Sequence, residues 1–67
     1  MNSNEIKELR KKYFSNQQSF ADICGFGRAS VQRWEAGTVQ PIKSNLILLE
    51  LYRDIPEVRE YLTREEE

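Results

Sequence analysis

The stretch 16–37 constrains the fold most, because apolar residues recur at helical spacing on both sides of a glycine-rich turn. The spacing predicts one helix over 16–24 and a second over 28–36, with Gly25-Phe26-Gly27 as the turn between them. Glycine can adopt the positive φ that ends a helix, and the phenylalanine between the two glycines is expected to plug the turn. Gly37 is expected to end the second helix. Two helices joined by a turn of this length form a helix-turn-helix.

The second helix of this pair has two different faces. Val31 and Trp34 are three residues apart and are expected to face inward, whereas the outward positions are polar or small. Arginine and glutamine match the groups that guanine and adenine present in the major groove of DNA, and alanine permits contact with a thymine methyl. The residues predicted to read bases are therefore Arg28, Ala29, Gln32 and Arg33. The alternative interpretation is a solvated polar face on an ordinary helical hairpin.

The other segments predict more helices and no strand, which gives an all-α fold class with five helices. Ile6, Leu9 and Tyr13 form the inner stripe of the first helix, and Ser3 or Asn4 is expected to cap it. The fourth helix is apolar on several sides, so it is either enclosed or shared with a partner. The predicted helices cover about 4–13, 16–24, 28–36, 43–53 and 55–63.

A chain of 67 residues forms one domain. We assign residues 1–64 to a single helix-turn-helix domain and residues 65–67 to an acidic, frayed tail. A chain this short buries a modest core, so close helix packing or dimerisation must add to its stability.

The side-chain inventory argues against several functions. The chain has one cysteine and no histidine, so we expect no internal disulfide, no metal site and no cofactor. Cys24 lies on the apolar side of its helix and is predicted to be a core residue rather than a reactive thiol. No nucleophile–base pair is visible, so an enzyme is not expected. No apolar run reaches membrane-spanning length and no signal peptide precedes the first helix, which favours a cytoplasmic protein without a membrane partner.

The charge distribution favours nucleic acid more than the net charge of −1 does. Residues 1–43 carry seven basic and four acidic side chains, whereas residues 44–67 carry three basic and seven acidic ones. Attraction to phosphates depends on the local patch, so the half that contains the helix-turn-helix is the half suited to DNA. We expect the acidic end to face away from DNA.

The helix-turn-helix stretch contains an ordered set of residues that points to a known family: Gln17, Phe20-Ala21, Gly25, Val31, Arg33-Trp34-Glu35, Gly37 and Pro41. At these residues the chain resembles lambda-repressor-like (Cro/C1, XRE-type) helix-turn-helix domains. The ungapped stretch Asn16 to Glu57 is most similar to the C-terminal DNA-binding domain of MqsA-type antitoxins, and Gln40-Pro41 and Pro56-Glu57 belong to this likeness.

Two positions depart from the pattern of the resembling proteins. Gly27 stands where serine or threonine usually caps the second helix of the motif, which puts the start of that helix in doubt. Ala29 stands where the MqsA-type proteins have asparagine, so their base preference does not carry over to this position. Arg33, in contrast, matches an arginine that reads bases in that group.

The resemblance also implies a scaffold around the reading surface. It implies an ion pair between Arg10 and Glu35, for which the alternative is an exposed and nearly neutral pair. It implies that Gln17 meets a phosphate and braces the second helix of the motif. The positive end of a helix favours a phosphate on physical grounds, although simple capping polarity would explain the same residue. Asn16 is expected to cap that helix, with Ser15 and Gln18 as a competing capping box. The predicted DNA-backbone contacts are Asn16, Gln17, Ser30, Thr38, Gln40 and Lys43.

Proteins of this type usually dimerise, and their two reading helices then enter successive major grooves. The predicted partners are a palindromic double-stranded DNA operator and a second copy of the chain. The candidate dimer residues are Leu51, Ile55, Val58 and Leu62, which could instead only cover the core.

The function expected from the resemblance is repression of the chain's own operon. The context could be a phage, a toxin–antitoxin operon, or a small repressor that accompanies anti-CRISPR genes. The alternative is a protein-interaction module, such as an antitoxin fragment that binds a toxin. The salt dependence of binding would separate the two functions.

Overall fold

The computed structural model describes residues 1–64, which form five α-helices and contain no strand. The predicted all-α fold class is confirmed, and the helix boundaries differ from the predicted ones by about one residue. The tail predicted for 65–67 lies outside the described residues. The helices are α1 (Ser3–Tyr13), α2 (Gln17–Cys24), α3 (Arg28–Ala36), α4 (Lys43–Asp54) and α5 (Pro56–Arg64).

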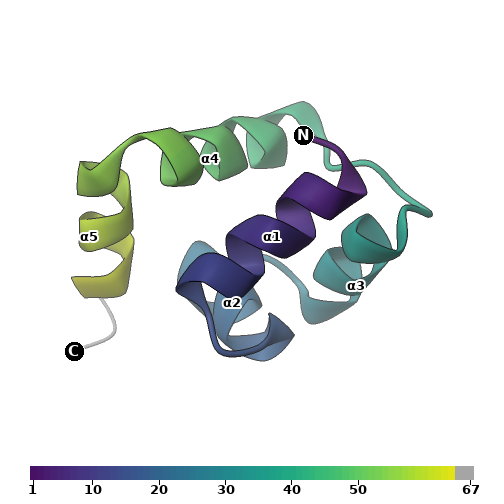
Figure 1. Cartoon of the computed structure of the whole chain (residues 1–67), viewed down its shortest axis with the longest axis horizontal. Helices are drawn as coiled ribbons and strands as arrows, with labels where there is room; N and C mark the ends of the chain where they lie inside the picture. The colour runs from purple at the N-terminus through teal and green to yellow at the C-terminus, as the bar shows by residue number, and fades with distance from the viewer. Residues whose placement is uncertain (65–67) are drawn as a thin grey trace.

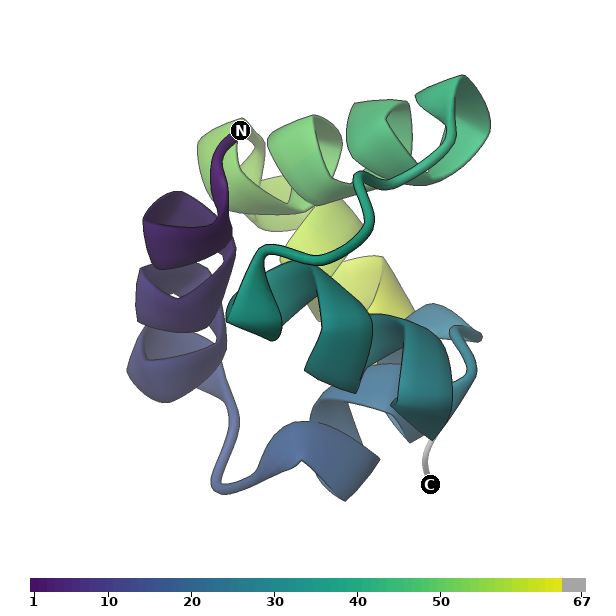
Figure 2. The same ribbon diagram turned by 90° about the vertical axis from the view of Figure 1, so that its right-hand side faces the viewer.

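The domain is elongated, with extents of 32 × 20 × 19 Å. Helices α1 and α2 both pack against α3, and α5 folds back from the end of α4 and also contacts α2. Along the long axis, α3 lies at one end of the domain and α5 at the other (Figure 1). Turned by 90°, α3 lies in front and α5 behind it (Figure 2). The predicted reading helix and the last helix are therefore at opposite ends of the molecule.

The core is built by α1 to α4 and the turn after α1, and α5 contributes no buried residue. Aromatic rings form a continuous series of contacts through this core, with centroid distances from 4.8 to 5.7 Å. The series begins between α1 and α4 and ends at a ring on the inward face of α3. In order of contact, the rings belong to Tyr13, Tyr52, Phe14, Phe20, Phe26 and Trp34.

The cap predicted for α1 is wrong by one or two residues. Asn2, rather than Ser3 or Asn4, is the N-cap: its Oδ1 accepts a hydrogen bond from the Glu5 N–H at 2.8 Å. The Glu5 carboxylate in turn accepts one from the Asn2 N–H at 2.9 Å, which completes a capping box. Asn2 is the cap because Glu5, the acidic partner of the capping box, stands three residues after it. A residue with that spacing is missing after Ser3, where Ile6 is buried in the core.

The cap predicted for α2 is confirmed. Asn16 has an extended backbone, and its side chain accepts a hydrogen bond from the Ser19 N–H at 2.8 Å. The competing box does not form, because Gln18 donates instead to Asp22, four residues later on the same helix, at 2.8 Å.

The fourth helix is not enclosed. Leu49 and Tyr52 are buried, whereas Ile47 is 46% exposed and Leu51 39% exposed. The surplus apolar surface of α4 therefore faces solvent in the single chain. Among residues 1–64, no helix is both long and apolar enough to cross a membrane.

Candidate nucleic-acid interface

Helix α3 is oriented as its sequence predicts. Val31 and Trp34 face inward with exposed fractions of 0% and 4%, and Glu35 is also buried. The four predicted base-reading positions, Arg28, Ala29, Gln32 and Arg33, are all exposed. The helix therefore presents one polar face to solvent and is anchored by the opposite face.

The inward face of α3 is supported by the turn that precedes it. Gly25 ends α2 with φ of 76°, and the next N–H, that of Phe26, donates to the carbonyl of Ala21 at 2.8 Å. This places the Phe26 ring against the ring of Trp34, edge to face, with centroids 4.8 Å apart. The predicted plug is confirmed. Because Phe26 also contacts Phe20, the turn fixes α3 to α2.

The two ends of α3 are closed in different ways. At the C-terminal end Gly37 has φ of 79°, and its N–H donates to the Trp34 carbonyl at 3.2 Å. The Thr38 N–H donates to the Arg33 carbonyl at 3.1 Å, which completes a Schellman motif. At the N-terminal end Gly27 is the N-cap and supplies no side-chain hydrogen bond. Gly27 has an ordinary φ of −77°, so of the two turn glycines only Gly25 uses a positive φ.

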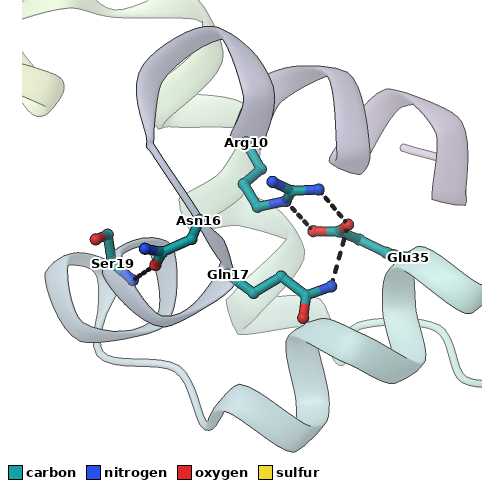
Figure 3. A network of polar contacts seen from close by, with 5 residues as sticks. All are labelled: Arg10, Asn16, Gln17, Ser19 and Glu35. Atoms are coloured by element: carbon teal, nitrogen blue, oxygen red, sulfur yellow. Dashed lines mark hydrogen bonds and ion pairs between the residues drawn. The ribbon is translucent and has the colours of Figure 1, made fainter.

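The predicted Arg10–Glu35 ion pair is confirmed (Figure 3). Arg10 Nε donates to Glu35 Oε2 at 2.8 Å, and Arg10 Nη2 donates to Oε1 at 3.1 Å. The side chains are 16% and 4% exposed, so the pair is largely removed from solvent. The fork geometry fixes the direction of both groups, and it ties α1 to α3 directly.

Gln17 joins this pair, in agreement with the bracing role that the resemblance implies. Its Nε2 donates to Glu35 Oε1 at 3.4 Å, so one carboxylate from α3 is held by α1 and by the first turn of α2 (Figure 3). The resemblance implied that Gln17 braces this helix, but it did not identify Glu35 as the partner. The observed bond orients the Gln17 amide beside the start of α2.

A shallow hollow of about 520 Å³ opens beside this network. It joins the N-terminal end of α2 to the first residue of α3, so it brings together groups that the sequence placed on different elements. Its lining is polar and includes Arg28 close to a helix N-terminus, an environment that favours a phosphate, whereas the charge of Arg10 is paired with Glu35. The lining residues are Arg10, Ser15, Asn16, Gln17, Gln18 and Arg28.

The other predicted backbone contacts lie on or after α3. Ser30 is half-buried, whereas Thr38, Gln40 and Lys43 are exposed on the segment that connects α3 to α4 and at the start of α4. The connecting segment runs from the C-terminal end of α3 to α4 on the side of the domain that α3 occupies (Figure 2). The Thr38 hydroxyl already donates to the Arg33 carbonyl at 3.3 Å, which stabilises the end of the helix.

The candidate dimer residues divide into two groups. Leu51 and Ile55 are exposed by 39% and 37%, whereas Val58 and Leu62 are half-buried. Leu62 packs against the core, so at this position the interpretation as core cover holds in the single chain. Ile47 was missed, although it stands four residues before Leu51 and eight before Ile55, a spacing that indicates a single helical stripe.

Cys24 is buried, as predicted for a core residue. Burial raises the pKa of its thiol from 9.0 to about 12, so the side chain stays protonated at neutral pH. No group of three or more His, Cys, Asp or Glu residues that could hold a metal ion occurs within 1–64.

Comparison with known proteins finds no protein similar to this chain. No family model, curated protein or solved structure matches the chain. The function is therefore inferred from the surface of α3 and from the elements that hold it.

Proposed function

We propose that this chain is a sequence-specific regulator that binds double-stranded DNA through a helix-turn-helix of the lambda-repressor-like (Cro/C1, XRE) type. In this proposal α2 crosses the DNA backbone, and α3, which we call the reading helix, enters the major groove. The observation that carries the proposal is the outward face of α3. Four residues suited to base contacts are exposed there, on a helix that is fixed from behind by packing and by an ion pair.

The chemistry of that face suits direct readout of bases. Arg33 and Arg28 would each pair with the O6 and N7 acceptors of guanine, and Gln32 would pair with N6 and N7 of adenine. Ala29 would contact a thymine methyl. A good bidentate pair contributes about 1–3 kcal/mol of discrimination against a wrong base, so two or three such pairs define a short half-site.

Phosphate contacts would position the reading helix. The hollow at the start of α2 is polar and is lined by Asn16 and Gln17. On the other side of α3, Ser30, Thr38, Gln40 and Lys43 would meet the opposite wall of the groove. Such contacts fix register and orientation but carry no sequence information directly.

A dimer would provide the discrimination that one short half-site lacks. Two reading helices related by a two-fold axis would enter successive major grooves about 34 Å apart on an inverted repeat. The exposed apolar residues of α4 and α5 supply the candidate surface for a second copy. A dimer bound over a promoter would block polymerase sterically. We therefore propose repression of the chain's own operon, in a phage, anti-CRISPR-associated or toxin–antitoxin setting.

The test is selection of binding sites from random double-stranded DNA by the purified full chain, followed by Arg33→Ala. We expect the wild type to select an inverted repeat. Arg33→Ala should lose about 1–3 kcal/mol on the selected sequence and relax the preference at one base position. Arg64→Ala on α5 removes the same charge at the opposite end of the domain and is the matched control, which should keep the wild-type preference.

Two results would contradict this assignment. If the wild type selects no sequence, the chain is not a sequence-specific DNA-binding protein. If Arg33→Ala weakens random and selected DNA equally, Arg33 contacts a phosphate and is not a base reader.

The alternative function is a protein-interaction module that binds a toxin. It is favoured by the combination of an acidic C-terminal half and exposed apolar residues on α4. The dependence of affinity on salt separates the two functions. DNA binding that neutralises several phosphates should weaken log-linearly with salt, with a slope of about −0.9 per phosphate.

A further inference from the structure

Arg59, near the middle of α5, contacts the ends of two other helices. Its Nη1 donates to the carbonyl oxygen of Tyr52 at 2.7 Å and to that of Arg53 at 2.9 Å, both in the last turn of α4. Its guanidinium also lies over the ring of Tyr13, the last residue of α1, at 4.6 Å from the ring centroid. One charged group therefore joins α1, α4 and α5.

The corner between α4 and α5 explains why a guanidinium is needed there. In a continuous helix the N–H of residue 56 would donate to the Tyr52 carbonyl, but Pro56 has no N–H. The preceding carbonyl, that of Leu51, is satisfied by the N–H of Ile55 at 2.9 Å, after which the chain turns. Arg59 supplies the missing donor, and its charge is favourable at the negative end of the α4 dipole.

The orientation of α5 depends strongly on this contact, because α5 has little core of its own. None of its residues is buried, and Val58 and Leu62 are only half-buried. The Tyr13 ring under the guanidinium is held in place better than α5 is. Tyr13 contacts Tyr52 edge to face at 5.6 Å, and Tyr52 is one of the most deeply buried side chains of the domain.

The same corner divides the candidate dimer surface. Leu51 and Ile55 lie before the turn, and Val58 lies just after it. In a two-fold dimer that uses both sides of the corner, the angle between α4 and α5 sets how one chain is oriented relative to its partner. Because α3 lies at the other end of the long axis, a small rotation at the corner becomes a large displacement of the reading helix (Figure 1).

We propose that Arg59 is a positioning residue that fixes the angle and distance between the two reading helices, and thereby selects the spacing of the two half-sites in the operator. This inference rests on the function proposed above. It concerns the spacing between half-sites and leaves the sequence read within each half-site to α3.

The experiment compares the full-length wild type with Arg59→Met, which keeps a long side chain but removes the charge and the donors. The DNA probes are the inverted repeat selected by the wild type, the same repeat with one or two base pairs added or removed between the half-sites, and a single half-site. One added base pair rotates a half-site by about 36° and prevents both half-sites from being bound at once, so the wild type should lose up to roughly 10²–10⁴-fold in affinity. Arg59→Met should bind the single half-site with the same affinity as the wild type. It should bind the selected repeat and its spacing variants with almost equal affinity.

Two further variants keep the test decisive if Arg59→Met does not fold. Arg59→Lys can donate to the carbonyls but has no planar group to lie over Tyr13, so we expect a spacing preference between those of wild type and Arg59→Met. Tyr13→Leu removes the ring but leaves the carbonyl contacts, and should also weaken the preference. Circular dichroism reports whether each variant is folded.

The inference is overturned if folded Arg59→Met keeps the wild-type spacing preference, or if it loses single half-site binding as strongly as binding to the repeat. Unchanged preferences in both Arg59→Lys and Tyr13→Leu would overturn it equally. If the wild type selects no DNA sequence, the proposed function itself fails and this inference fails with it. A wild type that selects a repeat whose spacing preference ignores Arg59 leaves the proposed function intact.

Discussion

Helices α1–α3 and the α4–α5 corner are held together by different means. In the first region a buried carboxylate on α3 is bound by α1 and α2, and aromatic rings fill the space behind it. At the corner, α5 buries no residue, and one arginine bonds two backbone carbonyls across the turn. The first region has several independent attachments, whereas the second depends on few.

This difference suits the two tasks that we propose for the regions. A surface that reads bases must hold its side chains in fixed positions, because a displaced donor loses its hydrogen bond. A surface that meets a second copy gains its buried area only on association, so apolar residues remain exposed in the single chain. Stability and rigidity are therefore expected to be concentrated around α3.

The largest expected effect tests that concentration with one apolar deletion in each region. Phe20→Ala removes a fully buried ring and should cost about 3–5 kcal/mol of unfolding free energy, much of the total for a domain of this size. Ile55→Ala removes a side chain that is 37% exposed and should cost less than about 1 kcal/mol. Urea denaturation at low protein concentration measures both. Equal losses would show that the two regions share one core and would end the comparison.

Glu35→Ala should have the next largest effect, because it removes the carboxylate through which α3 is bound to α1 and α2. Arg10 would be left without its partner in a largely buried site, at a cost of about 3 kcal/mol. The matched variant is the double substitution Arg10→Met with Glu35→Leu, which removes both charges and should recover most of the loss. A loss in Glu35→Ala below about 1 kcal/mol would mean that the pair behaves as an exposed one.

The elements that the sequence predicted well are those governed by local rules. Apolar spacing located all five helices to within about one residue, and Gly25 and Gly37 end helices at a positive φ as predicted. The inward direction of Val31 and Trp34 followed from the same spacing. These outcomes depend on short stretches of chain, so no knowledge of the tertiary structure was needed.

The features that the sequence did not reveal depend on residues far apart in the chain. The contact of Arg59 with Tyr13 joins helices whose relative placement no local pattern specifies. The link from Gln17 to α3 was implied by the family resemblance alone, and its partner Glu35 was not identified. The choice of Asn2 over Ser3 as the first cap is a local error of a different kind, because several neighbouring residues could serve and the position of Glu5 decided among them. The base-reading and dimer roles remain predictions.

The smallest expected effect lies at the weakest point of the first region, the uncapped start of α3. Gly27 has an extended backbone with an ordinary φ, and a Cβ there would meet only the Ser30 hydroxyl at an uncrowded 3.7 Å. Gly27→Ser should therefore add a capping hydrogen bond and stabilise the domain by a few tenths of a kcal/mol. Gly37→Ser is the matched control, since φ of 79° strains any side chain there and should destabilise by about 1 kcal/mol. Thermal unfolding of the two variants should shift in opposite directions. A decrease for Gly27→Ser would show that the folded domain does not accommodate a serine side chain at this position and would contradict the expected cap.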